Sequence, residues 1–442
     1  MTQTGDIVRI PAACGDEEAR RGFSAMARAM TPSNILTIAA EIRELKEKGT
    51  AVADMTVGDF APGQFPIPLG LREAITRELA SGQTNYPASP GEKTLREAVR
   101  EHVLRTQGLD YPLDGIVIVG GGRPALYSAY RVLVDPGELV LFPVPSWNNN
   151  NFGDVCQVRV QAVQTRPENA FQPTAELLAP HVSAARLIVL NTPSNPSGGV
   201  MRREDVAAMG RLLIAENARR RGTGEKPLYL LFDQIYQALI FPGYEHYSPV
   251  QLEPACAPYV IHVDGISKGF CATGLRCGWI FGPPAIAKKI TGLLTHLGAW
   301  APKPVQLGTA KFLRDTAALD AWGPNVIARV RERLDAVHEG IQALRAEGFP
   351  VDTIEPQGAI YISVRFDLSG KRGADGKMLS SNESVRAFLL REAAFALVPF
   401  SAFGVAPDNE DGWFRASVGA VSAQDIRDAM PRLRRALSAL RA

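Results

Sequence analysis

The sequence predicts an α/β protein with a mostly parallel sheet covered by helices, together with a second, smaller α+β lobe. Short apolar segments alternate with amphipathic helical segments through the middle of the chain. Strands that are apolar on both faces are typical of parallel sheets covered by helices. The hydrophobic content of 46% is enough for a sizeable core. The length of 442 residues favours two lobes over one compact domain.

Composition excludes several classes of function. The 48 basic and 46 acidic residues give a formal charge of +2 without a basic stripe, which argues against a nucleic-acid partner. The five cysteines are odd in number and never spaced C-x-x-C, a pattern of reduced thiols and not of disulfides or a zinc site. No apolar stretch reaches membrane-spanning length. We therefore expect a soluble cytoplasmic protein with no membrane partner.

Helical spacing dominates the N-terminal part of the chain. A polar arm over residues 1–32 precedes a helix between Ser33 and Gly49. The Pro/Gly-rich segment "TVGDFAPGQFPIP" then excludes a helix. Amphipathic spacing predicts further helices over 70–80 and 91–106.

Strands and helices alternate after this region, and helices then dominate from 284 to 347. The predicted strands are 115–119, 139–143, 185–191, 227–233, 259–265 and 275–283. Helices are predicted over 124–134 and 204–220. The remaining sequence mixes strands and helices, which indicates the smaller lobe.

Two candidate binding features follow predicted strands, where ligands of α/β sheets bind. In "VGGGRPALYSAY", Gly121 and Gly122 would let backbone N–H groups approach an anion at a helix N-terminus. A plain tight turn is the alternative. Trp147 either packs in a loop or offers a flat face to an aromatic ligand.

Polar side chains follow two more strands. Asn191 and Asn195 lie in "NTPSNPSGG", either as turn residues or as ligand contacts. Asp233 follows four apolar residues, where a carboxylate needs a cationic partner or else caps the next helix. Tyr236, three residues later, would reach the same ligand.

A lysine and an arginine lie in the segment "DGISKGFCATGLRCG". Burial would lower the pKa of Lys268 and suit it to a Schiff-base nucleophile. Arg276 would then return to the site as a phosphate clamp. Surface placement is the alternative for both. A phosphate cradle, an aromatic face, an amide, a carboxylate, a phenol and a reactive lysine together suit pyridoxal 5′-phosphate.

The order and spacing of these motifs resemble the class I/II aminotransferases of the fold-type I pyridoxal-phosphate enzymes. "NTPSNPSG" resembles N-x-P-x-N-P-x-G, "DQIY" resembles D-x-x-Y, and "SKGFCATGLRCG" resembles S-K-x(6)-G-x-R-x-G. The resemblance implies a seven-stranded large domain. It also implies a boundary between an N-terminal segment at 33–62, a pyridoxal-phosphate domain at 63–305 and a small C-terminal domain at 306–442.

The resemblance also implies residue roles. Lys268 would form the Schiff base and move the proton, and Asp233 would hold the ring nitrogen protonated. Asn195 and Tyr236 would bind the ring's phenolic oxygen, and Trp147 would stack on the ring. The implied phosphate site comprises Gly121, Gly122, Arg123, Ser267 and Arg276. Tyr86 would reach the partner subunit of a homodimer, while Arg415 and Gly58 would contact an α-amino acid.

Departures from the family pattern keep alternatives open. Gly265 replaces a usual serine, and Phe400 stands near the substrate side where glycine is usual. Trp300 either contacts substrate or packs. We expect an aminotransferase acting through aldimine and quinonoid intermediates. The alternative is Cβ/Cγ replacement, carbon–carbon bond formation or oxidation on the same scaffold. A non-catalytic regulator would need a DNA-binding helix, which the sequence does not indicate.

Overall fold

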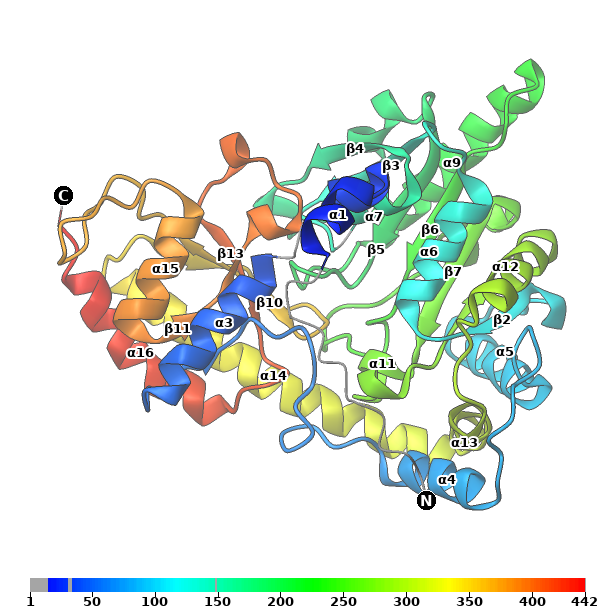
Figure 1. Ribbon diagram of the computed structural model, residues 1–442, viewed down its shortest axis with the longest axis horizontal. Helices are drawn as coiled ribbons and strands as arrows, with labels where there is room; N and C mark the ends of the chain where they lie inside the picture. Colours follow the sequence, from blue (N-terminus) through cyan, green and yellow to red (C-terminus); the bar gives the residue numbers. More distant parts are fainter. Residues whose placement is uncertain (1–14, 31–33, 148, 442) are drawn as a thin grey trace.

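The computed structural model describes residues 15–30, 34–147 and 149–441. These residues form a large lobe around a seven-stranded sheet and a small lobe around a four-stranded sheet (Figure 1). The strands of the large sheet are Ile116–Val119 (β2), Leu139–Val144 (β3), Arg159–Gln164 (β4), Ala185–Asn191 (β5), Tyr229–Asp233 (β6), Val260–Gly265 (β7) and Gly278–Phe281 (β8). Their order is β2-β8-β7-β6-β5-β3-β4.

Only β8 runs antiparallel to its neighbours in this sheet. The predicted mostly parallel sheet is therefore confirmed. Parallel strands need both faces covered, and alternate residues of the inner strands do enter different cores. In β5, for example, Ile188 and Leu190 belong to one core, whereas Leu187 and Val189 belong to the other.

Separate groups of helices cover the two faces. The face carrying Ile188 packs against Leu69–Ala80 (α4), Lys93–Gln107 (α5), Ala175–Leu178 (α8), Arg203–Thr223 (α9), Pro249–Leu252 (α10) and Lys303–Arg314 (α13). The opposite face packs against Gly122–Leu133 (α6), Asn149–Cys156 (α7) and Pro284–Leu297 (α12). Helix Ile266–Gly269 (α11) follows β7 directly.

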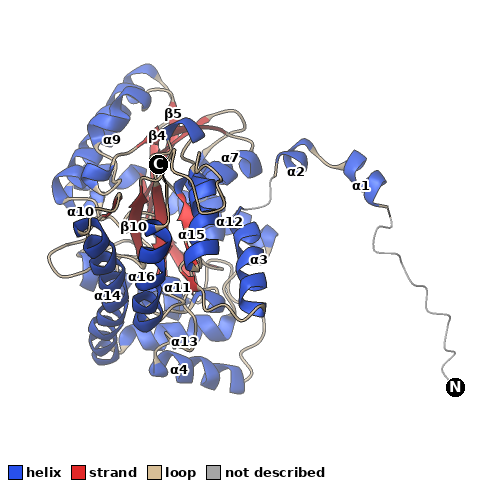
Figure 2. Ribbon diagram, turned by 90° about the vertical axis from the view of Figure 1, so that its left-hand side faces the viewer, coloured by secondary structure: helices blue, strands red, loops and turns tan. Residues whose placement is uncertain are grey.

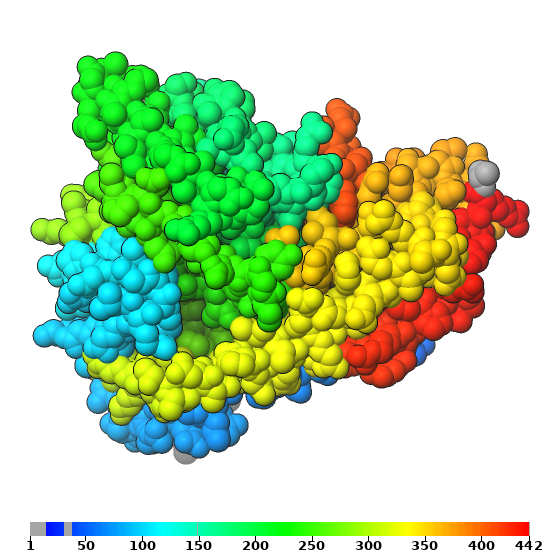
Figure 3. Space-filling view, turned by 180° about the vertical axis from the view of Figure 1, so that it is seen from behind, coloured from blue at the N-terminus to red at the C-terminus, as the bar shows by residue number. Residues whose placement is uncertain are grey.

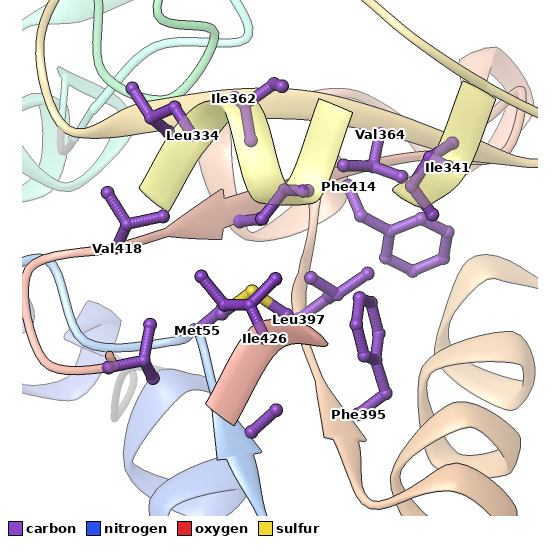
Figure 4. Close-up of a cluster of buried hydrophobic side chains, with 14 of the residues drawn as sticks. Met55, Leu334, Ile341, Ile362, Val364, Phe395, Leu397, Phe414, Val418 and Ile426 are labelled. Carbon is purple, nitrogen blue, oxygen red and sulfur yellow. The ribbon is translucent and has the colours of Figure 1, made fainter. Parts of the chain in front are cut away.

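The small lobe has an antiparallel sheet in the order β12-β13-β10-β9. Its strands are Val351–Thr353 (β9), Tyr361–Phe366 (β10), Val398–Pro399 (β12) and Trp413–Ser417 (β13), and its helices are Thr316–Ala346 (α14), Asn382–Ala393 (α15) and Ala423–Ser438 (α16). Figure 4 shows Leu334 and Ile341 of α14 beside Ile362 and Val364 of β10. This packing holds the long helix against the sheet.

Helix α14 and the N-terminal segment connect the lobes. Leu319 of α14 packs in the large-lobe core, whereas Leu334 packs in the small-lobe core. The helix accordingly runs along both lobes in Figure 3. Helix Asn34–Glu47 (α3) leads to Ala53–Asp54 (β1), which pairs in parallel with Phe395–Ala396 (β11) of the small lobe.

Elements of the N-terminal arm and of the segment 149–164 differ from the sequence prediction. The arm contains two short helices, Asp16–Gly22 (α1) and Ala25–Ala29 (α2), which extend away from the lobes in Figure 2. Ser24 caps α2 by accepting a hydrogen bond from the Ala27 amide at 3.1 Å. Neither α7 nor β4 was predicted, and most side chains of β4 are not buried, as expected at a sheet edge. Residues 1–14 and Ser33 lie outside the described residues.

Candidate active site

A cavity of about 420 Å³ lies where the large-sheet strands end and the small lobe begins. Both lobes and the N-terminal segment contribute lining residues. They include Thr56, Val57, Gly58, Asp59, Gly122, Arg123, Trp147, Asn191, Asn195, Asp233, Tyr236, Ser267, Lys268, Thr273, Arg276 and Arg415. Two larger surface cavities, of about 530 and 660 Å³, contain none of these residues. The chemistry-bearing side chains therefore gather in this cavity.

Lys268 lies on α11, immediately after β7, so its side chain enters the cavity from the end of the sheet. Its Nζ donates a hydrogen bond to the Gly58 carbonyl at 2.7 Å and lies 5.7 Å from the centre of the Tyr236 ring. The side chain is half-buried, so the full burial considered in the sequence analysis is not found. Its amine is held by a neutral carbonyl, from which it can move without breaking an ion pair.

Asp233 ends β6 and is followed by a turn, so the alternative that it caps the next helix is wrong. Its Oδ1 accepts a hydrogen bond from the Ile235 amide at 3.1 Å, which fixes the turn after the strand. The same side chain lines the cavity. Burial raises the pKa of this carboxyl to about 7, against the opposing effects of the Ile235 amide and the Lys268 charge. A cation entering the cavity would therefore find a carboxyl that gains from being paired.

A chain of hydrogen bonds connects β13 to the loop after β6. Arg415 Nη1 donates to Asn195 Oδ1 at 3.1 Å, and Asn195 Nδ2 donates to the Tyr361 hydroxyl at 3.2 Å. The Tyr361 and Tyr236 hydroxyl oxygens lie 2.7 Å apart. These hydrogen bonds therefore connect Arg415, Asn195 and Tyr236, which were predicted site residues, through Tyr361, which was not predicted.

Arg415 is buried although its described hydrogen-bond partners are neutral. Its Nη2 donates to the Thr56 carbonyl at 2.6 Å, and its guanidinium lies 4.9 Å from the Tyr361 ring centre and 4.8 Å from the Phe403 ring centre. Among the described residues, its Nε has no hydrogen-bond partner. Burial lowers the pKa of this guanidinium. A buried cation with neutral partners favours an anionic ligand.

The glycine turn before α6 approaches Arg276 closely. Gly121 has φ +95°, and a Cβ at this position would lie 2.4 Å from Arg276 Nη2. Arg276 itself adopts a left-handed conformation, with φ 54°, and donates through Nη1 to the Thr273 carbonyl at 2.6 Å. Gly122 begins the twelve-residue helix α6, whose N-terminal amides favour an anion. This corner can bind a phosphate group.

Not every residue from the sequence analysis lines the cavity. Gly121 lies behind Arg276 instead, and Tyr86 is 82% exposed, with its ring 5.4 Å from that of Trp300. Within the single chain, the Trp300 ring therefore lies against the exposed Tyr86 ring. Phe400 does not line the cavity either. It is buried, and its ring lies 5.1 Å from that of Phe171.

Close packing between β7 and β8 explains why position 265 is a glycine. A Cβ here would lie 2.7 Å from the Gly278 Cα, so a larger residue would separate β7 from β8. Thr273 Oγ1 donates a hydrogen bond to Asp59 Oδ1 at 2.5 Å, a contact that was not predicted from the sequence. Tyr361 was missed because a tyrosine among apolar strand residues is typical of a core.

The lining residues fit pyridoxal phosphate. Asp233 would face a ring nitrogen with an acid, Trp147 would offer a flat face, and the Gly122 and Arg276 corner would accept a phosphate. Lys268 would supply an amine for an aldehyde, and the buried Arg415 would supply a cation for a substrate carboxylate. The fold and this lining define the class as pyridoxal-phosphate-binding enzymes.

Comparison with known proteins gives the family. Residues 51–433 match the model for aminotransferase class I and II. The aspartate aminotransferase of Rhizobium meliloti is 29% identical over 91% of this chain and 92% of its own length. The aspartate/prephenate aminotransferase of Thermus thermophilus is 29% identical over 94% and 99%. The chain belongs to the class I and II aminotransferase family.

Solved structures agree with this assignment. The Rhizobium meliloti aspartate aminotransferase structure has a TM-score of 0.84 and 27% identity, covering 95% of this chain and all of that one. The Thermus thermophilus aspartate aminotransferase with maleate has a TM-score of 0.82 and 28% identity, covering 94% and 100%. The fold is therefore type I, and the chain is a pyridoxal-phosphate-dependent aminotransferase acting on an α-amino acid. The alternative reactions are not favoured.

No helix in the part of the chain that the structure describes combines the length and apolar character needed to cross a membrane.

The buried carboxyl of Asp233 gives a pH prediction for the cofactor-free protein. Its pKa is about 7 in the folded state against an ordinary 3.8, so the folded state binds an extra proton between these values. Stability should therefore fall as pH rises from about 4 to about 7. Asp233→Asn should reduce this slope by roughly 1.4 kcal/mol per pH unit. Urea unfolding at a series of pH values measures it.

A slope equal to that of the parent protein would contradict the assignment of a buried, protonated Asp233. Asp59→Asn is the matched control, because Asp59 lines the same cavity and is only half-buried.

Proposed function

We propose that Lys268 carries the covalent link to the cofactor and moves the proton during transamination of an acidic α-amino acid. The observation that carries this proposal is one cavity lined by Lys268, the buried acid Asp233 and the buried cation Arg415. Pyridoxal phosphate, when bound, supplies an aldehyde carbon and a ring that withdraws electrons from the substrate α-carbon. The remaining chemistry belongs to side chains of this chain.

Asp233 binds and charges the ring nitrogen in this proposal. Because its carboxyl is buried and forms no ion pair with the residues that the structure describes, a protonated ring nitrogen offsets the desolvation of the carboxylate. Asn195 and Tyr236 bind the phenolic oxygen, and Trp147 packs on the ring face. Support comes from their shared cavity lining.

The phosphate group is bound by the corner around α6. Arg276 and Ser267 donate from their side chains, while Gly121, Gly122 and the Arg123 backbone form the glycine turn and helix N-terminus. The exposed Arg276 guanidinium and the close approach at Gly121 support this assignment. A guanidinium binds a phosphate with two parallel hydrogen bonds.

Lys268 holds and transfers a proton at Nζ. The Gly58 carbonyl, which accepts a hydrogen bond from this amine, positions it beside the cavity without neutralising it. A neutral acceptor would allow the amine to move between the Gly58 carbonyl and the cavity. General acid–base transfer by a positioned side chain contributes about 10²- to 10⁴-fold to a rate.

Arg415 binds the substrate α-carboxylate. Its position between the Tyr361 and Phe403 rings orients the guanidinium, and its Nε, which has no hydrogen-bond partner in the described part of the chain, has unused donor capacity. Gly58 leaves room beside it, because a Cβ there would lie 3.3 Å from Arg415 Nη1. These contacts favour a bidentate carboxylate complex.

The Arg123 side chain binds a second, side-chain carboxylate of the substrate. Its guanidinium lies 5.0 Å from the Trp147 ring centre and, among the described residues, contacts no acidic group. The names of the relatives support a dicarboxylic substrate, because they are aspartate aminotransferases and one structure contains maleate. Aspartate and maleate each carry two carboxylates.

The active protein is a cytoplasmic homodimer with shared sites. Tyr86 supports the dimer, because it lies outside the cavity and is 82% exposed in the single chain. In the homodimer the Tyr86 hydroxyl contacts the phosphate group of the cofactor that is bound in the other subunit. The buried, unpaired Cys156, Cys256, Cys271 and Cys277 support a reducing compartment.

Lys268→Ala tests the covalent role. Borohydride treatment of the cofactor-loaded parent should leave a pyridoxyl label on the peptide containing Lys268, whereas the variant should carry none. Its turnover with aspartate should fall by at least about 100-fold. Mass spectrometry locates the label, and Lys288→Ala is the control. A label on a different lysine would refute the assignment.

Arg123→Gln tests the second-carboxylate site. Loss of a charge-assisted contact should lower kcat/KM for aspartate by about 10- to 100-fold. Alanine, which has no side-chain carboxylate, should be affected far less. Equal losses for the two donors would instead assign the Arg123 side chain to the cofactor.

A mixed-dimer experiment tests the shared site. Tyr86→Ala and Lys268→Ala should each be impaired alone, whereas refolding them together should restore activity. Random assortment of a symmetric dimer leaves about a quarter of the sites with both native residues. Activity assays after co-refolding measure the recovery. No recovery, with dimers present by sedimentation, would mean that Tyr86 acts within its own subunit.

A further inference from the structure

Tyr361 lies at the centre of the contacts around the cavity. It begins β10 in the small lobe and is fully buried. Its ring lies beneath the Arg415 guanidinium, and its hydroxyl contacts both Asn195 and Tyr236. A Cβ at Gly58 would lie 3.0 Å from the same hydroxyl, so the oxygen is enclosed on that side.

The available protons fix the direction of these hydrogen bonds. The Asn195 amide donates to the Tyr361 oxygen. If Tyr236 also donated to it, the Tyr361 proton would need a further acceptor, and the described contacts of its hydroxyl contain none. A buried hydroxyl proton without an acceptor is unfavourable. Tyr361 therefore donates to Tyr236.

This direction determines which protons face the cavity. With its oxygen accepting from Tyr361, the Tyr236 hydroxyl keeps its own proton free for a ligand. Asn195 uses Oδ1 for Arg415 and one Nδ2 hydrogen for Tyr361, so its second Nδ2 hydrogen is also free. Both free donors belong to cavity-lining residues.

We propose that Tyr361 is a positioning residue that orients the Asn195 amide and the Tyr236 hydroxyl toward a single anionic oxygen in the cavity. The inference rests on the proposed function, in which that oxygen is the phenolic oxygen of the cofactor. Its ring and its hydroxyl have separate tasks: the ring packs on Arg415, and the hydroxyl sets the two donors. Tyr361 itself contacts no reacting atom.

Tyr361→Phe removes the hydroxyl and leaves the ring on Arg415. Two weakened hydrogen bonds to the phenolic oxygen destabilise its anion, so the covalent link to Lys268 should hold its proton to higher pH. The pH midpoint of the bound cofactor's visible absorbance change should rise by about 0.5 to 1 unit. The dissociation constant of pyridoxal phosphate, measured by fluorescence titration, should rise severalfold.

Tyr130→Phe is the matched control. Tyr130 is a buried tyrosine whose hydroxyl forms a hydrogen bond to Asn149 at 3.2 Å, and it does not line the cavity. Its variant should lose stability like Tyr361→Phe but keep the parental absorbance midpoint. Thermal melting of both cofactor-free variants shows whether they fold equally.

A double variant tests whether Tyr361 acts through its neighbour. Since Tyr361 orients Tyr236, adding Tyr361→Phe to Tyr236→Phe should shift the midpoint less than the sum of the two single shifts. A midpoint for Tyr361→Phe equal to that of Tyr130→Phe, or fully additive shifts, would overturn the proposal. Failure of the Lys268 assignment is a separate result, because borohydride labelling of the parent protein detects it directly.

Discussion

The buried guanidinium of Arg415 makes the geometry of the cavity depend on three distant parts of the chain. Its hydrogen-bond acceptors are the Thr56 carbonyl of the N-terminal segment and the Asn195 side chain of the large lobe, while β13 of the small lobe carries it. A buried cation needs such partners, because an unsatisfied charge is costly. Segments that are remote in sequence must therefore meet for this residue to be stable, and their meeting encloses the cavity.

The large sheet explains why the remaining groups arrive at the same place. Parallel strands bring their carboxyl ends to one edge, so Asp233 after β6 and Lys268 after β7 become neighbours despite the helices and loops between them. The glycines at the β7–β8 contact let those strands approach closely. The binding chemistry thus follows from strand order, and the small lobe adds Arg415 and Tyr361 to it.

The sequence predicted elements and residues correctly where the residue type is typical of only one environment, such as a buried strand. The buried strands were predictable from continuous apolar segments, whereas edge strand β4 was not, because its side chains are largely exposed. Lys268 and Asp233 could be selected because charged residues among apolar neighbours require a reason. Tyr361 gave no such signal, since a phenol in a strand packs equally well as a core residue. The packing of Phe400 could not be predicted, because its partner, Phe171, is far away in sequence.

Two adjacent buried acids show how local contacts divide chemical roles. Burial raises the pKa of both Asp233 and Asp264 to about 7, and the charge of Asp233 further disfavours ionisation of Asp264. Asp264 is enclosed by the Gly265 amide and the Gln237 side chain, whereas Asp233 faces the cavity. A ligand cation can therefore stabilise the anion only at Asp233. The Gly265 amide and the Gln237 side chain oppose the effect of burial on the pKa of Asp264, so this carboxyl finds its partners within the protein and Asp233 is the acid that faces a ligand.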